Sequence, residues 1–268
     1  MSEAQTNHQG EATAGAGPVH SERHAGVLVV SIDRPRQRNA VNRAVSLGIA
    51  AALQTLDRDP ELHVGVLTGR GGSFCSGMDL HAFLAGERPE LEKLGFGGLT
   101  EMPPEKPLIA AVEGYALAGG CELALACDLI VAAENAWFGL PEVTRGLVAG
   151  SGGLVRLPRR IPVGIALEYA LTGDRMDAPT AHRWGLVNRL TPPGEALQGA
   201  LTLAARIADN APLAVAMSKR IVRESAQWSP AEVWDRQRPL VESVVSSEDA
   251  REGATAFAEK RAPRWQGR

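Results

Sequence analysis

The chain has 268 residues, of which 44% are hydrophobic, and a formal net charge of -3. This length and composition allow one large core with a smaller appendage, while the slightly acidic balance argues against a nucleic-acid-binding protein, which would carry a basic face. The three cysteines lack disulfide or metal-ligand spacing, and no apolar run reaches the roughly 18 residues of a membrane span, so we expect a soluble protein of the reducing cytoplasm.

Strands and helices alternate in the first part of the chain. Residues 1–18 contain no Leu, Ile, Val or aromatic residue, and we expect a disordered tail there. A β-branched run at 26–33 predicts a buried strand, and Asn42 is a suitable N-cap for the helix that follows. Residues 64–68 predict the next strand, and Asp79 is placed to cap a short helix. This order is typical of a parallel sheet.

Residues 107–128 are the most informative stretch. They predict an apolar strand, a glycine-containing turn and a helix that begins near Gly119 and carries Glu122 in its first turn. Free backbone N–H groups and the positive end of the helix dipole favour developing negative charge at such a position. Taken alone, the dipole also explains the glutamate, and tight packing explains Gly119 and Gly120.

The remaining chain divides into a mixed part and a helical part. We expect a mobile loop or short helix at 86–106, a strand at 129–132, a glycine-rich bend at 146–153, and helices at 162–171, 196–209, 212–226, 230–246 and 248–260. The predicted organisation is therefore a tail at 1–18, an α/β core at 19–195 and a C-terminal helical region at 196–268.

Two acids and two backbone donors form a candidate site. Pro141 before Glu142 predicts a helix start, and a return of the chain through one strand can bring Glu142 beside Glu122. If both carboxylates face one space, repulsion and unequal burial should separate their pKa values, so that one donates a proton and the other accepts from water. The N–H groups of Met78 and Gly119 can then form an oxyanion hole.

Other motifs in the chain are weaker. The bend at 150–153 is close to a dinucleotide-binding fingerprint, but Val155 stands where its last glycine belongs, so we expect no nicotinamide cofactor. The same bend resembles a nucleophile elbow without its first glycine, and His182 follows in hydrolase order, but no clear strand precedes Ser151. The six histidines show no metal spacing, so we expect no metal site.

Several ordered motifs resemble those of the crotonase superfamily, the enoyl-CoA hydratase/isomerase family, from about residue 24 to the end. The matching segments are 34–42, 74–80, 107–123, 138–142, 171–174 and 257–261. The resemblance implies an α/β fold, a crotonase-like spiral of ββα repeats with a C-terminal helical trimerisation region. It also implies a homotrimer, often arranged as a dimer of trimers.

The resemblance further implies an acyl-CoA thioester substrate, whose carbonyl oxygen is held by the N–H groups of Met78 and Gly119. In hydratases of this family two acids occupy the positions of Glu122 and Glu142. Glu142 would deliver a proton to Cα, and Glu122 would hold the water that attacks Cβ. Isomerases commonly keep only the second acid, so the resemblance favours an enoyl-CoA hydratase acting in fatty acid metabolism such as β-oxidation, with no cofactor beyond the CoA thioester.

The same resemblance assigns further contacts with CoA. It implies that Arg38, Ala40, Asp79 and Leu80 line the CoA site, and that Phe257 and Lys260 reach the CoA of a neighbouring subunit. Acyl specificity is expected to depend on residues 81–104, which carry Phe83, Leu84, Leu91, Leu94 and Phe96.

The chain departs from the family pattern at Met78, which replaces a commonly small residue. It also departs at Ala149, Leu154 and Val155, which replace Pro, Thr and Gln. Three alternatives therefore stay open beside hydration. They are double-bond isomerisation, hydrolysis of a thioester or carbon–halogen bond, and binding of acyl-CoA without catalysis.

Overall fold

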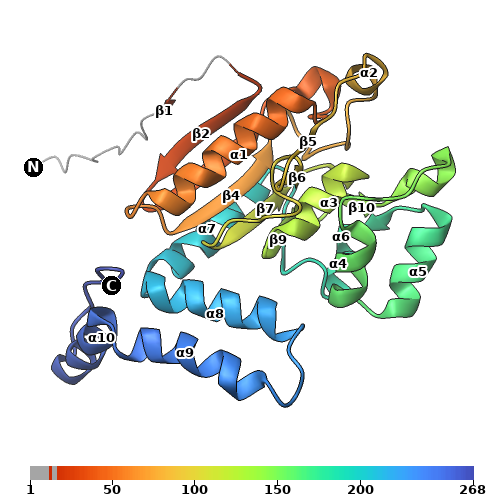
Figure 1. Ribbon diagram of the computed structural model, residues 1–268. Coiled ribbons are helices and arrows are strands. Elements are labelled where there is room, and N and C mark those ends of the chain that lie inside the picture. Colours follow the sequence, from red (N-terminus) through yellow and green to blue (C-terminus); the bar gives the residue numbers. More distant parts are fainter. Residues whose placement is uncertain (1–11, 14–16) are drawn as a thin grey trace, which may run out of the picture.

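The computed structural model describes residues 12–13 and 17–268. Within these residues, a seven-stranded sheet has the strand order β1-β2-β3-β4-β7-β9-β12 (Figure 1). Its strands are β1 Ala12–Thr13, β2 Val19–His24, β3 Val27–Ile32, β4 Val64–Gly69, β7 Leu108–Val112, β9 Leu129–Ala133 and β12 Arg189–Thr191. Strands β1, β2 and β3 are antiparallel, and the sheet is parallel from β3 to β12.

A second, smaller sheet lies beside the first. It contains β8 (Tyr115–Leu117), β10 (Trp137–Gly139) and β11 (Met176–Asp177), and β8 is parallel to β10. Cys75 extends this layer through a parallel bridge to Ala116 of β8. The chain therefore passes from a strand of the large sheet, through the small layer, to a helix, and it does so after β4, β7 and β9. This repetition confirms the predicted spiral of ββα repeats.

The helices that end these three repeats are α2 (Leu80–Leu84), α3 (Gly119–Ala126) and the 3-10 turn η2 (Pro141–Arg145). Their starts follow local sequence signals. Asp79 caps α2 by accepting hydrogen bonds from the N–H groups of His81 and Ala82, and Pro141 opens η2. Instead of the mobile loop or short helix expected at 86–106, a hairpin of β5 (Glu90–Leu91) and β6 (Gly95–Phe96) follows α2.

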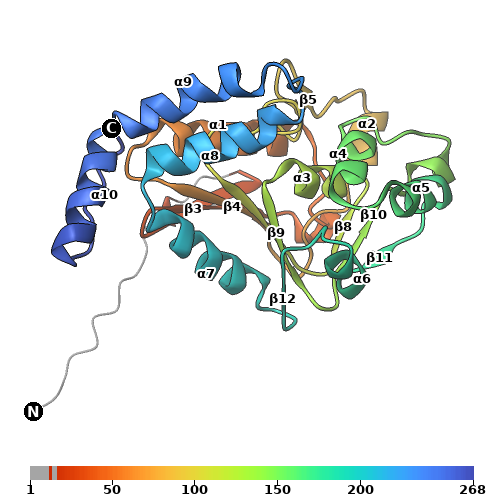
Figure 2. The same cartoon turned by 90° about the horizontal axis from the view of Figure 1, so that it is seen from below.

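Helices cover both faces of the large sheet. Helix α1 (Arg43–Arg58), capped by Asn42, packs against alternate residues of β3 such as Val30, while α7 (Ala196–Ala208) packs against the intervening Val29. Figure 2 shows α7 on the opposite side of the sheet from α1. All six residues of β3 are consequently buried, as the continuous apolar run predicts.

The remaining helices are η1 (Pro35–Gln37), α4 (Gly153–Arg160), α5 (Val163–Thr172), α6 (Ala178–Arg183), α8 (Pro212–Ser225), α9 (Val233–Val245) and α10 (Glu248–Glu259). The helical C-terminal region is thus as expected, although α7 covers the sheet while α8 to α10 extend from it (Figure 1). Lys219 anchors α8 through an ion pair of 2.7 Å with Asp128 after α3. Most of the predicted tail lies outside the described residues, but Ala12–Thr13 pair with β2.

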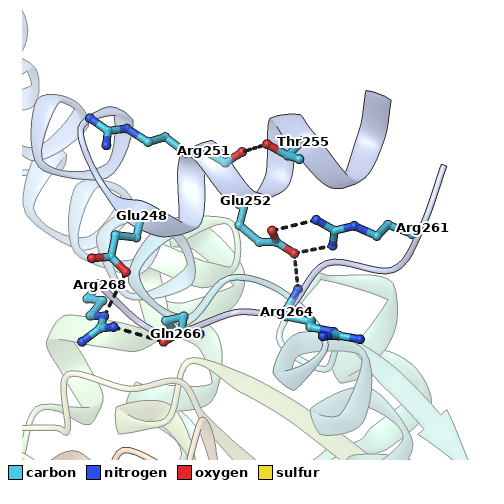
Figure 3. A pocket seen from close by; sticks show the side chains of 8 residues that line it. All are labelled: Glu248, Arg251, Glu252, Thr255, Arg261, Arg264, Gln266 and Arg268. Atoms are coloured by element: carbon cyan, nitrogen blue, oxygen red, sulfur yellow. Dashed lines mark hydrogen bonds and ion pairs between the residues drawn. The ribbon is translucent and has the colours of Figure 1, made fainter. Parts of the chain in front are cut away.

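The C-terminal segment folds back onto α10. Asp249 is buried and accepts hydrogen bonds from the N–H groups of Gln266 and Gly267 at 2.6 and 2.9 Å. Figure 3 shows the resulting pocket, of about 660 Å³, in which Arg261 makes a two-pronged ion pair with Glu252. The arginines of this C-terminal segment are thus largely paired with acids of α10.

Across the described residues, no helix is both long and apolar enough to cross a membrane.

Close packing at Gly120 gives a stability prediction. A Cβ on Gly120 would overlap the carbonyl oxygen of Cys75 and lie 2.8 Å from its carbonyl carbon. We expect Gly120→Ala to lower the free energy of unfolding by about 1 to 3 kcal/mol, measured by denaturant titration. Gly164→Ala is the matched control, because Gly164 of α5 has no atom within 4 Å of the added Cβ and alanine favours helices. Equal stability of the two variants would contradict this account.

Candidate active site

Three consecutive repeats place their predicted site residues at equivalent positions. Met78 follows the small-layer segment at Cys75, Gly119 follows β8, and Glu142 follows β10. Because these strands are parallel neighbours, their carboxyl ends lie at one edge of the layer. The repeat architecture therefore explains how residues far apart in the sequence are brought to one place.

The turn before α3 is strained. Ala118 has φ 50° and ψ -129°, a conformation that residues with a Cβ rarely adopt, and its N–H donates to the carbonyl oxygen of Gly139 at 2.9 Å. Such a conformation costs on the order of 1 to 3 kcal/mol and persists where surrounding contacts hold it. It reverses the chain so that Gly119, the first helical residue, presents its N–H at the free end of α3.

Two backbone N–H groups at this edge have no hydrogen-bond acceptor in the described part of the chain. Hydrogen bonds link Val41 to Gly77 and Asp79 on either side of Met78, but none of the described residues accepts a bond from the N–H of Met78 or Gly119. A Cβ on Gly77 would lie 3.1 Å from the backbone nitrogen of Gly119. The turn that carries Met78 is therefore packed against the start of α3, as an oxyanion hole requires.

Glu122 lies buried in the first turn of α3, with 3% of its surface exposed. Its Oε1 accepts hydrogen bonds from the N–H groups of Ser151 at 2.7 Å and Gly153 at 2.9 Å. Burial raises the pKa of Glu122 and the charge of Glu142 raises it further, while the two N–H donors and Arg156 oppose the rise. The two glutamates are thus within electrostatic reach, and the N–H donors stabilise the ionised form of Glu122.

Glu142 has a different environment. Its Oε2 is buried and has no hydrogen-bond partner in the described part of the chain. Burial raises the pKa of Glu142 above its ordinary value, because an unpaired buried carboxylate is costly. Burial thus raises the pKa of both carboxyl groups, and two backbone N–H donors hold one oxygen of Glu122 in place.

The glycine bend at 150–153 has a role that sequence reasoning missed. Its N–H groups hold the carboxylate of Glu122, and a Cβ on Gly153 would lie 3.0 Å from Cγ of that glutamate. The signal in the sequence was the run of glycines, which suits close approach of backbone to an anion. Phe96 was named for acyl specificity, yet its ring covers Gly119, where a Cβ would lie 2.6 Å from Cε1.

The residues expected to bind CoA divide into two groups. Arg38, Ala40, Asp79 and Leu80 lie together with Met78, because Val41 bridges to that turn. Arg38 and Leu80 are exposed, and Ala40 is buried. The carboxylate of Asp79 is already occupied, since it pairs with Arg34 at 2.8 Å and caps α2.

The second group, Phe257 and Lys260, lies at the end of α10. That helix is at the opposite end of the molecule from α2 (Figures 1 and 2). Phe257 is 88% exposed, and Lys260 ends the helix with a left-handed conformation, φ 54°. Within one chain, therefore, the structure does not bring these residues to the glutamates.

The described residues contain no group of three or more His, Cys, Asp or Glu side chains that can hold a metal ion. Of the residues expected to govern acyl specificity, Leu91 and Phe96 are buried, whereas Leu84 is 82% exposed. These side chains do not share one surface.

Comparisons with known proteins point to one family. A family model described as enoyl-CoA hydratase/isomerase matches residues 22–268. A carnitinyl-CoA dehydratase of Salmonella typhi is 45% identical over 258 residues, which cover 93% of this chain and 98% of that protein. The crystal structure of enoyl-CoA hydratase from Mycobacterium tuberculosis H37Rv has a TM-score of 0.93 and 57% identity, covering 94% of this chain and 100% of that one.

A second similar structure is that of carnitinyl-CoA hydratase from Mycobacterium avium. It has a TM-score of 0.76 and 46% identity, covering 95% of this chain and 100% of that one.

Proposed function

This chain belongs to the enoyl-CoA hydratase/isomerase family, and we propose that it is an enoyl-CoA hydratase, a hydro-lyase that adds water across the 2,3 double bond of a 2-enoyl-CoA thioester. The observation that carries the proposal is the pair of Glu122 and Glu142, together with the N–H groups of Met78 and Gly119, which have no acceptor among the residues that the structure describes. Proton transfer and stabilisation of an oxyanion are what this reaction requires, and no metal or organic cofactor is needed.

The geometry supports a specific sequence of steps. The thioester oxygen accepts bonds from the N–H groups of Met78 and Gly119, whose donors stabilise the enolate charge. Oε1 of Glu122 is occupied by Ser151 and Gly153, so its other oxygen accepts the proton of the attacking water. The water oxygen bonds to Cβ, the π electrons move toward the thioester, and Glu142 donates its proton to Cα. Proton exchange with solvent then restores both glutamates.

The relatives give a second candidate substrate. Two of the similar proteins are a carnitinyl-CoA dehydratase and a carnitinyl-CoA hydratase, at 45% and 46% identity. Hydration and dehydration are one reaction in opposite directions, so the same catalytic groups serve both. Only the acyl group distinguishes this candidate from a fatty 2-enoyl-CoA.

A panel of substrates tests the proposal. We expect the protein to add one water to at least one 2-enoyl-CoA with a short, medium or branched acyl chain, or to remove one from carnitinyl-CoA, as measured by mass spectrometry. A shifted double bond at constant mass would indicate an isomerase, and release of free CoA would indicate a thioester hydrolase. CoA thioester retained without change would indicate a binding protein. Absence of hydration and dehydration across the panel would contradict the proposal.

The pH dependence of kcat should be bell-shaped. Glu122 acts as the ionised acceptor, so activity is lost as pH falls through its pKa. Glu142 acts as the protonated donor, so activity is lost as pH rises through its pKa. Burial raises the pKa of both groups above the ordinary value of 4.5, which moves both limbs toward neutral pH. Steady-state rates across pH measure the limbs, and a flat profile would contradict these roles.

We extend the proposal to assembly and to CoA. A homotrimer, or a dimer of trimers, would bring Phe257 and Lys260 of one subunit to the CoA held at Arg38, Ala40, Asp79 and Leu80 of another. The exposure of large apolar side chains supports assembly, and the highest values are at Leu84, Phe257, Val222 and Leu171. Light scattering measures the assembly. The free, buried thiols of all three cysteines are consistent with the cytoplasm as the proposed compartment.

A further inference from the structure

We propose that Arg156 is a positioning residue that fixes the bend at Ser151–Gly153 around the carboxylate of Glu122. The inference rests on the proposed hydration, because it concerns how Glu122 is oriented toward water. Arg156 lies in α4, directly after the bend. Among the described residues, its guanidinium donates hydrogen bonds to Ser151 and Thr100 and makes none with Glu142.

The first observation is that the bend is held from two sides. Nη1 of Arg156 donates to the carbonyl oxygen of Ser151 at 3.2 Å. The N–H of the same Ser151 donates to Oε1 of Glu122 at 2.7 Å. The guanidinium therefore fixes the residue that in turn holds the carboxylate, and Gly153 supplies the second donor.

The second observation is that a Cβ on Gly152 or Gly153 would meet the side chain of Arg156 or of Glu122. Gly152 has φ +98°, and a Cβ there would overlap Nη1 of Arg156 and lie 3.1 Å from its Cζ. A Cβ on Gly153 would lie 3.0 Å from Cγ of Glu122. The backbone of the bend thus lies between the guanidinium of Arg156 and the carboxylate of Glu122. If the guanidinium moves, the N–H groups that bind this carboxylate can move as well.

The third observation is a link to the other half of the site. Nη2 of Arg156 donates to the carbonyl oxygen of Thr100. The N–H of Thr100 donates to the carbonyl oxygen of Phe96, whose ring covers Gly119. One guanidinium fork therefore connects the bend that holds Glu122 to the segment that packs on the proposed oxyanion donor. An arginine can bridge two carbonyl groups in this way because its donors are fixed in one plane.

The charges around this bend act in a definite direction. Glu122 faces Glu142 of η2 and Arg156 of α4, while Arg156 also faces Arg159 and Arg160 of its own helix and Arg223 of α8. The positive charge of Arg156 favours the ionised form of Glu122, which opposes its burial and the charge of Glu142. Loss of the charge should therefore raise the pKa of Glu122.

The test compares three variants. Arg156→Gln removes the charge and the fork, Arg156→Lys keeps the charge without the fork, and Arg159→Gln removes a charge from an exposed position of the same helix. For each, kcat and KM are measured across pH. In parallel, infrared spectra of the substrate-free protein follow the carbonyl stretch of protonated carboxyl groups with pH, and the spectra of Glu122→Gln identify the contribution of Glu122.

We expect Arg156→Gln to lower kcat by up to about 100-fold, with a much smaller change in KM, because the acceptor is misplaced rather than removed. The acid limb of kcat and the infrared titration of Glu122 should both move to higher pH. Arg156→Lys should restore the titration but only part of kcat, and Arg159→Gln should match the wild type.

An unchanged Glu122 titration in Arg156→Gln would overturn the inference, as would wild-type kcat in Arg156→Lys. If Arg156→Gln does not fold, the lysine variant decides through its kcat. Failure of the wild type to hydrate any 2-enoyl-CoA would instead overturn the proposed function. In that case the infrared titration still determines whether Arg156 controls Glu122.

Discussion

Replacing Glu142 with glutamine should lower kcat for hydration by about 100- to 10,000-fold, the usual range for loss of a general acid. The amide fills the volume of the carboxyl group but has no proton that it can transfer to Cα. Substrate binding uses other groups, so KM should change much less. Steady-state kinetics with the best enoyl-CoA of the panel measures both constants, and a wild-type kcat would show that Glu142 is not the donor.

The same variant should not be destabilised. The raised pKa of Glu142 means that the folded protein holds this proton more tightly than the unfolded chain. The stability that this tighter proton binding contributes is therefore fully present below the ordinary pKa of 4.5. It is lost as pH rises through the pKa of Glu142 in the folded protein. Glu142→Gln should be at least as stable as the wild type at neutral pH, and this advantage should shrink at acid pH. Thermal unfolding at two pH values measures it.

Glu134→Gln is the matched control for Glu142→Gln. Glu134 is exposed and lies just before β10, whereas Glu142 lies just after it. The control should leave both kcat and stability at wild-type values. A comparable loss of activity in the control would show that the effect belongs to the region rather than to the buried carboxyl group.

Local signals explain what the sequence allowed us to predict. The N-caps at Asn42 and Asp79, the proline before Glu142 and the glycines before Glu122 each define an element within a few residues. The C-terminal helices were placed within a few residues for the same reason. Both glutamates and both backbone donors could be named because each lies at such a boundary.

Other elements had no such signal. Strand β2, with the sequence VHSERH, is largely polar because it lies toward the edge of the sheet, and β8 and β10 are too short to show a period. The sequence did not predict helix α4 either, because the glycines at its start are typical of a loop and Pro158 lies inside it.

The environment of the two acids is not local either. Gly153 is 31 residues from the glutamate it binds, and Arg156 is 56 residues from Thr100. The buried oxygen of Glu142, which has no partner among the described residues, depends on packing that no short segment encodes. The sequence could therefore suggest two acids, whereas their different surroundings could be seen only in the fold.

The other large effect is expected from Gly77→Ala, which should lower kcat by about 100- to 1,000-fold, as loss of an oxyanion-hole donor does. The new methyl group would lie 3.1 Å from the nitrogen of Gly119 and 2.9 Å from Cβ of Ala118. Gly77 also has φ +102°, which alanine rarely adopts. A backbone shift that removes the close contact or the strained φ moves the N–H of Met78 or that of Gly119. The two N–H groups can then no longer donate to the same oxygen.

Gly72→Ala separates this effect from backbone strain. Gly72 also has a positive φ, +79°, but a Cβ there would have no atom within 4 Å. Both variants should lose stability from the strained backbone, on the order of 1 to 3 kcal/mol, and only Gly77→Ala should lose activity as well. Binding of a saturated acyl-CoA, measured by calorimetry, should weaken less than kcat falls, because the N–H donors act mainly on the charge that develops during reaction. Equal kcat in the two alanine variants would mean that the Met78 turn takes no part in stabilising the oxyanion.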